Sequence, residues 1–189
     1  EWNGMECNGM ESTAYTSRIA QPFTDALSLY AIGLIAGNLV NVYSDNAGKD
    51  GWEKITLAST IGGMVINTAG VTLAHGMEHP ASGLRDIVHG KGLAALTPAI
   101  IEASYTGNES KFADIAKLFG GKEAKDLALK IRELLKSINL NCTLSDLGIE
   151  EKDIPWMAEN CMKVSAASVA NNPVVFTQEQ IADIYKKAL

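Results

Sequence analysis

The chain of 189 residues has few cysteines, few basic residues and few histidines, and each of these scarcities limits the classes of function that the protein can have. Sixteen Lys and Arg against 22 Asp and Glu give a net charge of −6, and no basic cluster occurs, which argues against a nucleic-acid-binding protein. The cysteines, Cys7, Cys142 and Cys161, are far apart and form no CxxC pair, which predicts free thiols in a reducing, cytoplasmic compartment. The chain starts at Glu1 with no charged and then apolar leader, so we expect no targeting signal.

Sustained alternation of apolar and polar residues, which is typical of a half-buried strand, is also missing. Apolar residues instead recur at helical spacing, as at Leu127, Ile131 and Leu134. Patterns beginning at Thr143 and Thr177 resemble the capping boxes that start helices. The sequence therefore predicts an all-α fold with eight or nine helices in one compact domain.

Two segments, residues 26–44 and 55–74, contain no charged residue and raise the question of a membrane protein. Both contain Ser, Thr, Asn or Gly throughout, and neither has the basic flank that sets the orientation of a membrane helix. We therefore expect buried helices of a large core and no membrane partner. A small integral membrane protein is the alternative, and solubility without detergent would exclude it.

All the histidines lie in one stretch, HGMEHPASGLRDIVHG. His75 and His79 are four residues apart, which on a helix places their Cβ atoms roughly 5–6 Å apart on one face. Pro80 lacks a backbone donor and disfavours helical geometry before it, so we expect the helix to end there and a loop to lead to His89. Three imidazoles placed in this way can converge on one cation, although a surface pair or a satisfied core pair is the other interpretation. A metal site would usually need a fourth ligand, such as a carboxylate, from elsewhere in the chain.

The histidine stretch resembles the signature of the iron-containing (group III) alcohol dehydrogenases, in the dehydroquinate synthase-like superfamily. That signature is H-x-x-x-H-P, a loop, and then H-G opening the next helix. The segments QPFTDALSLYAI, SDLGIEEKDIP and NNPVVFTQEQIADIYKKAL resemble further parts of the family. The resemblance implies that residues 1–189 are the C-terminal all-α metal-binding and catalytic domain. The N-terminal α/β domain that binds NAD(P), with its glycine-rich turns, has no counterpart in these residues.

The resemblance also implies a metal held by four protein ligands, two of them on the first helix of this half. His75 and His89 correspond to metal ligands, Glu6 takes the place of the family's Asp, and Met10 takes the place of its His. A carboxylate suits Fe(II) or Zn(II), but a thioether is a poor ligand for either, so Met10 is also interpreted as a core-filling side chain. His79 corresponds to the residue beside the nicotinamide and the substrate that takes part in the proton path.

The function implied by the resemblance is interconversion of small alcohols and aldehydes by hydride transfer. Fe(II) or Zn(II) would act as the Lewis acid, and NAD or NADP would be bound mainly by the N-terminal domain, so we expect the chain alone to be inactive. The expected partners are that domain and the alcohol or aldehyde; the oligomeric state is open, a homodimer included. Two alternatives stay open: a fragment or divergent member with a degraded metal site acting as a structural or oligomerisation domain, and a metal-binding helical protein unrelated to dehydrogenases.

Overall fold

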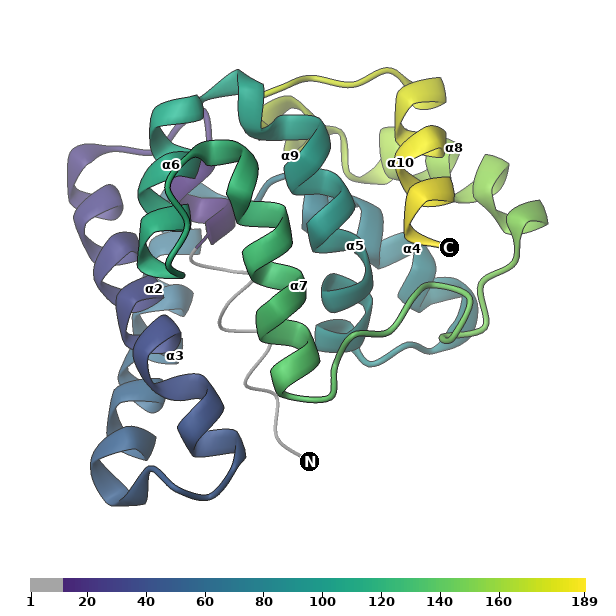
Figure 1. Ribbon diagram of the computed structural model, residues 1–189. Coiled ribbons are helices and arrows are strands. Elements are labelled where there is room, and N and C mark those ends of the chain that lie inside the picture. Colours follow the sequence, from purple (N-terminus) through teal and green to yellow (C-terminus); the bar gives the residue numbers. More distant parts are fainter. Residues whose placement is uncertain (1–11) are drawn as a thin grey trace.

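The computed structural model describes residues 12–189, which form a bundle of helices without a β-strand (Figure 1). The α-helices are α2 (Pro22–Tyr43), α3 (Gly48–Ala69), α4 (Leu73–Arg85), α5 (His89–Ser104), α6 (Glu109–Leu118), α7 (Leu127–Ser137), α8 (Ile154–Val164), α9 (Ala166–Asn171) and α10 (Gln178–Ala188). Three 3-10 helices of three residues each lie between them. The predicted all-α fold with eight or nine helices is confirmed for the described part of the chain. Glu6, Cys7 and Met10 lie outside the described residues.

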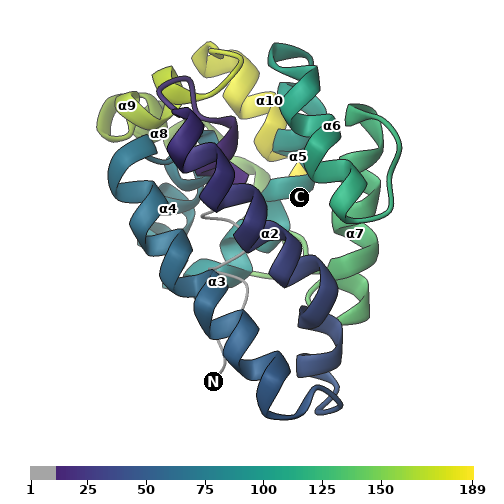
Figure 2. The same cartoon turned by 90° about the vertical axis from the view of Figure 1, so that its left-hand side faces the viewer.

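Helices α2 and α3 run side by side along one flank of the bundle (Figure 2). Among residues 12–189, α2 is the single helix long and apolar enough to cross a membrane, and α3 with α4 passes that test only as a pair bent by 104°. Core helices of soluble proteins pass the same test, and Ile32, Ile35 and Leu39 of α2 are fully buried in the bundle. The expectation of no membrane span stays a prediction.

Helices α4 and α5 form the centre of the bundle, where α8 and α10 cover them (Figure 1). Their facing side chains, among them Leu73, Met77 and Leu96, are completely buried. The hydroxyl of Tyr185, on α10, donates a hydrogen bond of 2.5 Å to the backbone carbonyl of Met77. This contact satisfies a buried phenol in the way that such groups require, and it fixes α10 across the middle of α4. The two histidine-bearing helices thus rest on a tightly packed core.

Helix α4 does not end at His79, and the prediction of a loop after Pro80 is wrong for residues 80–85. The helix continues through Pro80 to Arg85 and ends where Asp86 adopts a left-handed conformation, with φ 51° and ψ 44°. A proline inside a helix costs about 3 kcal/mol. Pro80 and the completely buried Ala81 belong to the buried side of α4, so burial in the core compensates for the local cost.

Of the two predicted capping boxes, the one at Thr177 starts a helix and the one at Thr143 does not. Thr177 Oγ1 accepts a hydrogen bond of 3.3 Å from the backbone N–H of Gln180, and α10 begins directly after Thr177. Thr143 Oγ1 accepts the corresponding bond of 3.2 Å from Asp146. The residues that follow form turns, and Gly148 has a φ of 85°. A capping box therefore fixes the first turn but does not ensure that a helix follows.

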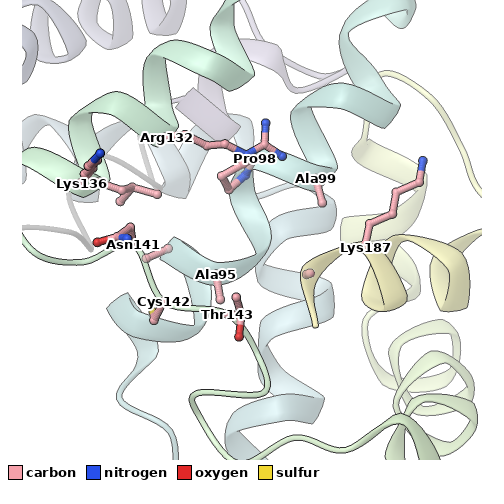
Figure 3. A pocket seen from close by; sticks show the side chains of 12 residues that line it. Ala95, Pro98, Ala99, Arg132, Lys136, Asn141, Cys142, Thr143 and Lys187 are labelled. Carbon is pink, nitrogen blue, oxygen red and sulfur yellow. The ribbon is translucent and has the colours of Figure 1, made fainter.

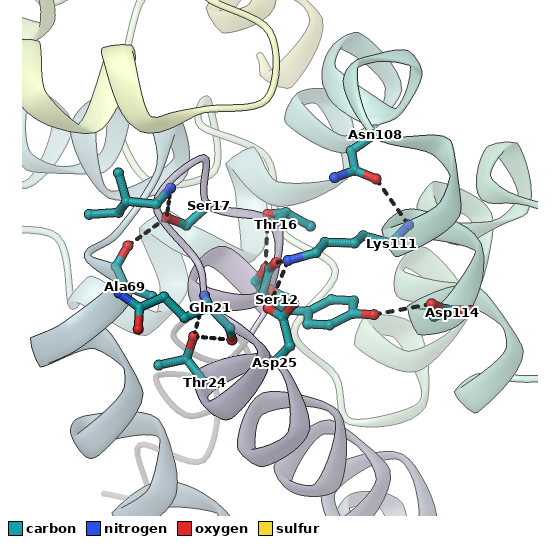
Figure 4. A network of polar contacts seen from close by, with 12 residues as sticks. Ser12, Thr16, Ser17, Gln21, Thr24, Asp25, Ala69, Asn108, Lys111 and Asp114 are labelled. Atoms are coloured by element: carbon teal, nitrogen blue, oxygen red, sulfur yellow. Dashed lines mark hydrogen bonds and ion pairs between the residues drawn. The ribbon is translucent and has the colours of Figure 1, made fainter.

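A polar network holds the helical residues 12–16 against α2 and α6 (Figure 4). The Lys111 ammonium donates hydrogen bonds of 2.7 Å to the carbonyl of Tyr15 and to Asp25 Oδ1. The hydroxyl of Tyr15 donates a bond of 3.1 Å to Asp114 Oδ2. Burial and Asp114 raise the pKa of Tyr15, so this hydroxyl keeps its proton. The start of the described chain is thereby fixed on the bundle.

The cysteines in the described part of the chain are free thiols, as predicted. Cys161 is buried, and its burial raises the thiol pKa to about 12. Burial also raises the pKa of Cys142. Neither thiol ionises near neutral pH, so both are unsuited to thiolate chemistry.

Candidate metal centre

The end of α4 and the start of α5 bring the three histidines together. His75 and His79 lie one turn apart on α4, and His89 is the first residue of α5, as predicted. The ring centroids of His75 and His89 are 5.2 Å apart, those of His79 and His89 are 5.8 Å apart, and those of His75 and His79 are 6.4 Å apart. Residues that the sequence predicted as two metal ligands and a catalytic group therefore form one cluster.

The three imidazoles differ in their exposure to solvent. His75 is 6% exposed, the side chain of His89 is 33% exposed, and His79 lies on the surface. Burial, and to a smaller extent the neighbouring His89 and His79, lower the pKa of His75 to about 4. His75 is therefore neutral at physiological pH, and a neutral imidazole is the form that binds a metal. Its Nδ1 is buried and has no hydrogen-bond partner, which is a further reason to expect a ligand here.

The lowered pKa of His75 predicts a specific pH dependence of folding in the metal-free chain. Between pH 6.5 and about 4 the unfolded chain binds a proton at this residue and the folded chain does not. The free energy of unfolding should therefore fall by about 3 kcal/mol as the pH is lowered through this range. His75→Leu should remove this contribution, and chemical denaturation of both chelator-treated chains at several pH values measures it. Identical pH dependence in the two chains would contradict the prediction.

A fourth side chain, Glu78, belongs to the cluster and was missed in the sequence. Glu78 is completely buried, and its carboxylate accepts a hydrogen bond from the Ser82 hydroxyl and is in hydrogen-bond contact with Nδ1 of His89. One ligand atom each from Glu78, His79 and His89 lie within 4.8 Å of one another. The sequence contained one signal for this residue, an acidic side chain between two histidines on a predicted helix.

The donor set fits a first-row divalent metal. Imidazoles such as those of His75 and His89 are ligands that both Fe(II) and Zn(II) accept, and the buried, neutral His75 is already in its binding form. The predicted ligands Glu6 and Met10 lie outside the described residues, so their assignment stays a prediction. The carboxylate among residues 12–189 that adjoins the histidines is Glu78.

A separate cavity of about 300 Å³ lies between α5, α7 and α10 (Figure 3). Arg132, Lys136 and Lys187 contribute basic side chains to its wall. Arg132 is already paired with Glu102 at 2.5 Å. None of the described residues that line this cavity is a histidine, so the cavity is distinct from the metal centre.

A helical domain that gathers three imidazoles and a buried carboxylate at the junction of two helices belongs to the class of candidate metal-binding proteins. Residues 9–189 match the model of the Fe-containing alcohol dehydrogenase family, C-terminal domain. The chain therefore belongs to this family, and the resemblance found in its histidine stretch is confirmed.

Similar proteins agree with this assignment. The chain is 36% identical to a 1,3-propanediol dehydrogenase of Klebsiella pneumoniae, over 98% of this chain and 49% of that protein. It is 32% identical to a lactaldehyde reductase of Escherichia coli K12, over 92% of this chain and 47% of that protein. The crystal structure of a 1,3-propanediol oxidoreductase superimposes with a TM-score of 0.91 at 35% identity, covering 98% of this chain and 50% of that one. The chain thus spans about half the length of the relatives it matches.

Proposed function

We propose that this chain is the helical, metal-binding half of an NAD(P)-linked alcohol dehydrogenase that interconverts small alcohols and aldehydes. The observation that carries the proposal is the cluster of His75, His79 and His89 in a chain of this family. The relatives named 1,3-propanediol dehydrogenase and lactaldehyde reductase favour a short, polar alcohol or aldehyde as the substrate. Because the chain spans about half of those proteins, the nucleotide would be bound mainly by a further N-terminal α/β domain.

The three histidines would have different roles, which follow from how deeply each is buried. His75 and His89 would hold the cation, with Glu6 and Met10 as the candidates for the remaining positions. The bound Fe(II) or Zn(II) would supply Lewis-acid activation of the substrate oxygen. His79 is the most exposed of the three imidazoles, and its ring centroid lies 5.8 Å from that of His89. It would face the substrate and the nicotinamide and carry the hydroxyl proton to solvent, a task for which an imidazole is suited near neutral pH.

Hydride transfer in the full-length protein tests the proposal. We expect the protein, loaded with iron or zinc, to oxidise NADH or NADPH in the presence of a short aldehyde such as the aldehyde of 1,3-propanediol. Loss of the absorbance of the reduced nicotinamide measures the reaction, and the chelator-treated protein is the control. A metal-loaded protein that leaves both nucleotides unchanged with every short aldehyde and alcohol tried would contradict the proposal.

A structural or oligomerisation domain is the second candidate, and Met10 is the residue that favours it. A methionine where the family has a histidine would leave a cation with one strong ligand fewer. This candidate predicts a folded chain that retains neither iron nor zinc. Elemental analysis of the purified full-length protein separates the two functions.

A further inference from the structure

Glu78 is a buried carboxylate with a single ion-pair partner among residues 12–189. It is 0% exposed and lies on α4 one turn after His75, and its partner is His89, the first residue of α5. A buried charge is costly unless hydrogen bonds and an opposite charge or a metal compensate for it. The contact between Glu78 and His89 therefore needs a reason beyond the packing of two helices.

The fold makes a specific space for this carboxylate. Gly92 lies three residues after His89 on α5, and a Cβ atom added there would lie 2.7 Å from Oε1 of Glu78 and 2.8 Å from its Cγ. Both distances are far too short for a real contact, so Glu78 occupies space that exists because residue 92 has no side chain. The position of Glu78 between α4 and α5 is thus fixed by the backbone of α5.

Both oxygens of the carboxylate are occupied. Oε1 accepts a hydrogen bond from the hydroxyl of Ser82, and Oε2 is in hydrogen-bond contact with Nδ1 of His89. A carboxylate that is engaged on both sides is placed to orient a histidine rather than to bind a cation itself. A carboxylate that faces Nδ1 favours the tautomer with the proton on Nδ1, which leaves the lone pair on Nε2.

We propose that Glu78 is the positioning residue of the metal centre: it holds His89 with its proton on Nδ1 and thereby presents Nε2 as a metal ligand. A carboxylate behind a ligating histidine also makes the imidazole a stronger donor. The negative charge of Glu78 also stabilises the bound cation electrostatically, although Glu78 contacts the ligand His89 and not the cation itself. This inference rests on the proposed function, because it assumes that the histidine cluster binds a metal.

Zinc affinity and the tautomer of His89 test the inference together. We compare the chain with its variants Glu78→Gln, which keeps the shape and removes the charge, and Glu78→Ala, which removes the hydrogen bond. Zinc affinity, measured by competition with a chromophoric chelator, should fall about 10- to 100-fold in Glu78→Ala and by less in Glu78→Gln. Nitrogen-15 NMR of the metal-free chain should show the proton of His89 on Nδ1, and a mixture of tautomers in Glu78→Ala.

Two further variants separate positioning from a loss of structure. Gly92→Ala should act in the same direction as Glu78→Ala, because the new methyl group would displace the carboxylate from its slot. Ser82→Ala removes the other partner of Glu78 but leaves its contact with His89, so its zinc affinity should stay close to that of the parent. Thermal unfolding of each metal-free variant confirms that it is folded.

Parental zinc affinity and an unchanged His89 tautomer in both Glu78 variants would overturn the inference. If the parent chain binds no zinc, the proposed metal-dependent function is contradicted. The NMR comparison then still decides the role of Glu78: a shift of the His89 tautomer in Glu78→Ala supports positioning, and no shift refutes it.

Discussion

His75→Ala is expected to abolish metal binding by the chain. His75 is 6% exposed and neutral at physiological pH, and its ring centroid lies 5.2 Å from that of His89. Its imidazole is therefore a buried metal ligand, and a water molecule in its place would bind the metal more weakly. Iron or zinc measured by elemental analysis should fall from about one per chain to background, since a site with so few strong ligands does not survive the loss of one. His75→Asn, which keeps a polar group in the buried position, should lose the metal as well.

The matched control for that experiment is His79→Ala. Both residues lie on α4, but His79 is exposed and is proposed to act on the proton rather than on the metal. The His79 variant should therefore retain its metal while both His75 variants lose it. Full metal content in folded His75→Ala would remove this residue from the ligand set.

His79→Gln is expected to slow the full-length enzyme by about 10²- to 10⁴-fold in kcat, which is the usual contribution of a positioned general acid or base. The substitution keeps a polar side chain of similar length but no group that exchanges a proton near neutral pH. The kcat of aldehyde reduction, followed by the absorbance of the reduced nicotinamide, measures the effect. The dependence of kcat on pH should also change, because glutamine cannot exchange a proton at this position.

Metal content distinguishes a catalytic role of His79 from a structural one. The His79→Gln enzyme should carry as much iron or zinc as the parent and should unfold at a similar temperature, because the side chain is exposed. An unchanged kcat and an unchanged pH profile would show that the proton leaves by another route.

The sequence predicted the all-α fold and the position of His89 because both depend on local patterns. Helical spacing of apolar residues is set by the geometry of the helix, and the pair His89-Gly90 opens α5 as the family signature suggested. The approach of His75 to His89 was also predictable, since a helix followed by a short connection leaves the two imidazoles little freedom to separate.

The prediction that α4 ends at Pro80 is wrong because it considers only the local free-energy cost of a proline in a helix. It leaves out the stabilisation gained when the neighbouring side chains are buried in the core. Met77 and Ala81 lie on either side of it in sequence, and both are completely buried. Burial of such side chains contributes about 1.5–3 kcal/mol for a large one, which is comparable with the cost of the proline. Tertiary packing therefore extends the helix by five residues beyond Pro80.

Tertiary contacts also explain why no helix follows Thr143. Its capping bonds form as predicted, but the next backbone N–H, that of Leu144, donates a bond of 2.8 Å to the carbonyl of Ala188 at the end of α10. This contact with a distant segment, and the left-handed Gly148, hold the chain in turns. No local pattern in the sequence predicts a hydrogen bond between Leu144 and a residue 44 positions further along the chain.

The role of Glu78 could not be assigned from the sequence, because it depends on how α5 encloses the side chain and not on the distance between residues along the chain. An acidic residue next to His79 is most simply a solvated side chain, and only the approach of Gly92 from α5 shows that it is enclosed. The first-helix ligands Glu6 and Met10 were assigned from the family resemblance, and they lie outside the described residues.

Anomalous diffraction from crystals of the iron- or zinc-loaded chain tests the central claim most directly, because it locates the metal itself. We predict a single strong peak about 2.0–2.2 Å from one ring nitrogen of His75 and one of His89, with the carboxylate of Glu78 behind His89. A peak elsewhere in the molecule, or no peak from metal-soaked crystals in which the three imidazoles are well ordered, would contradict a metal centre at the junction of α4 and α5.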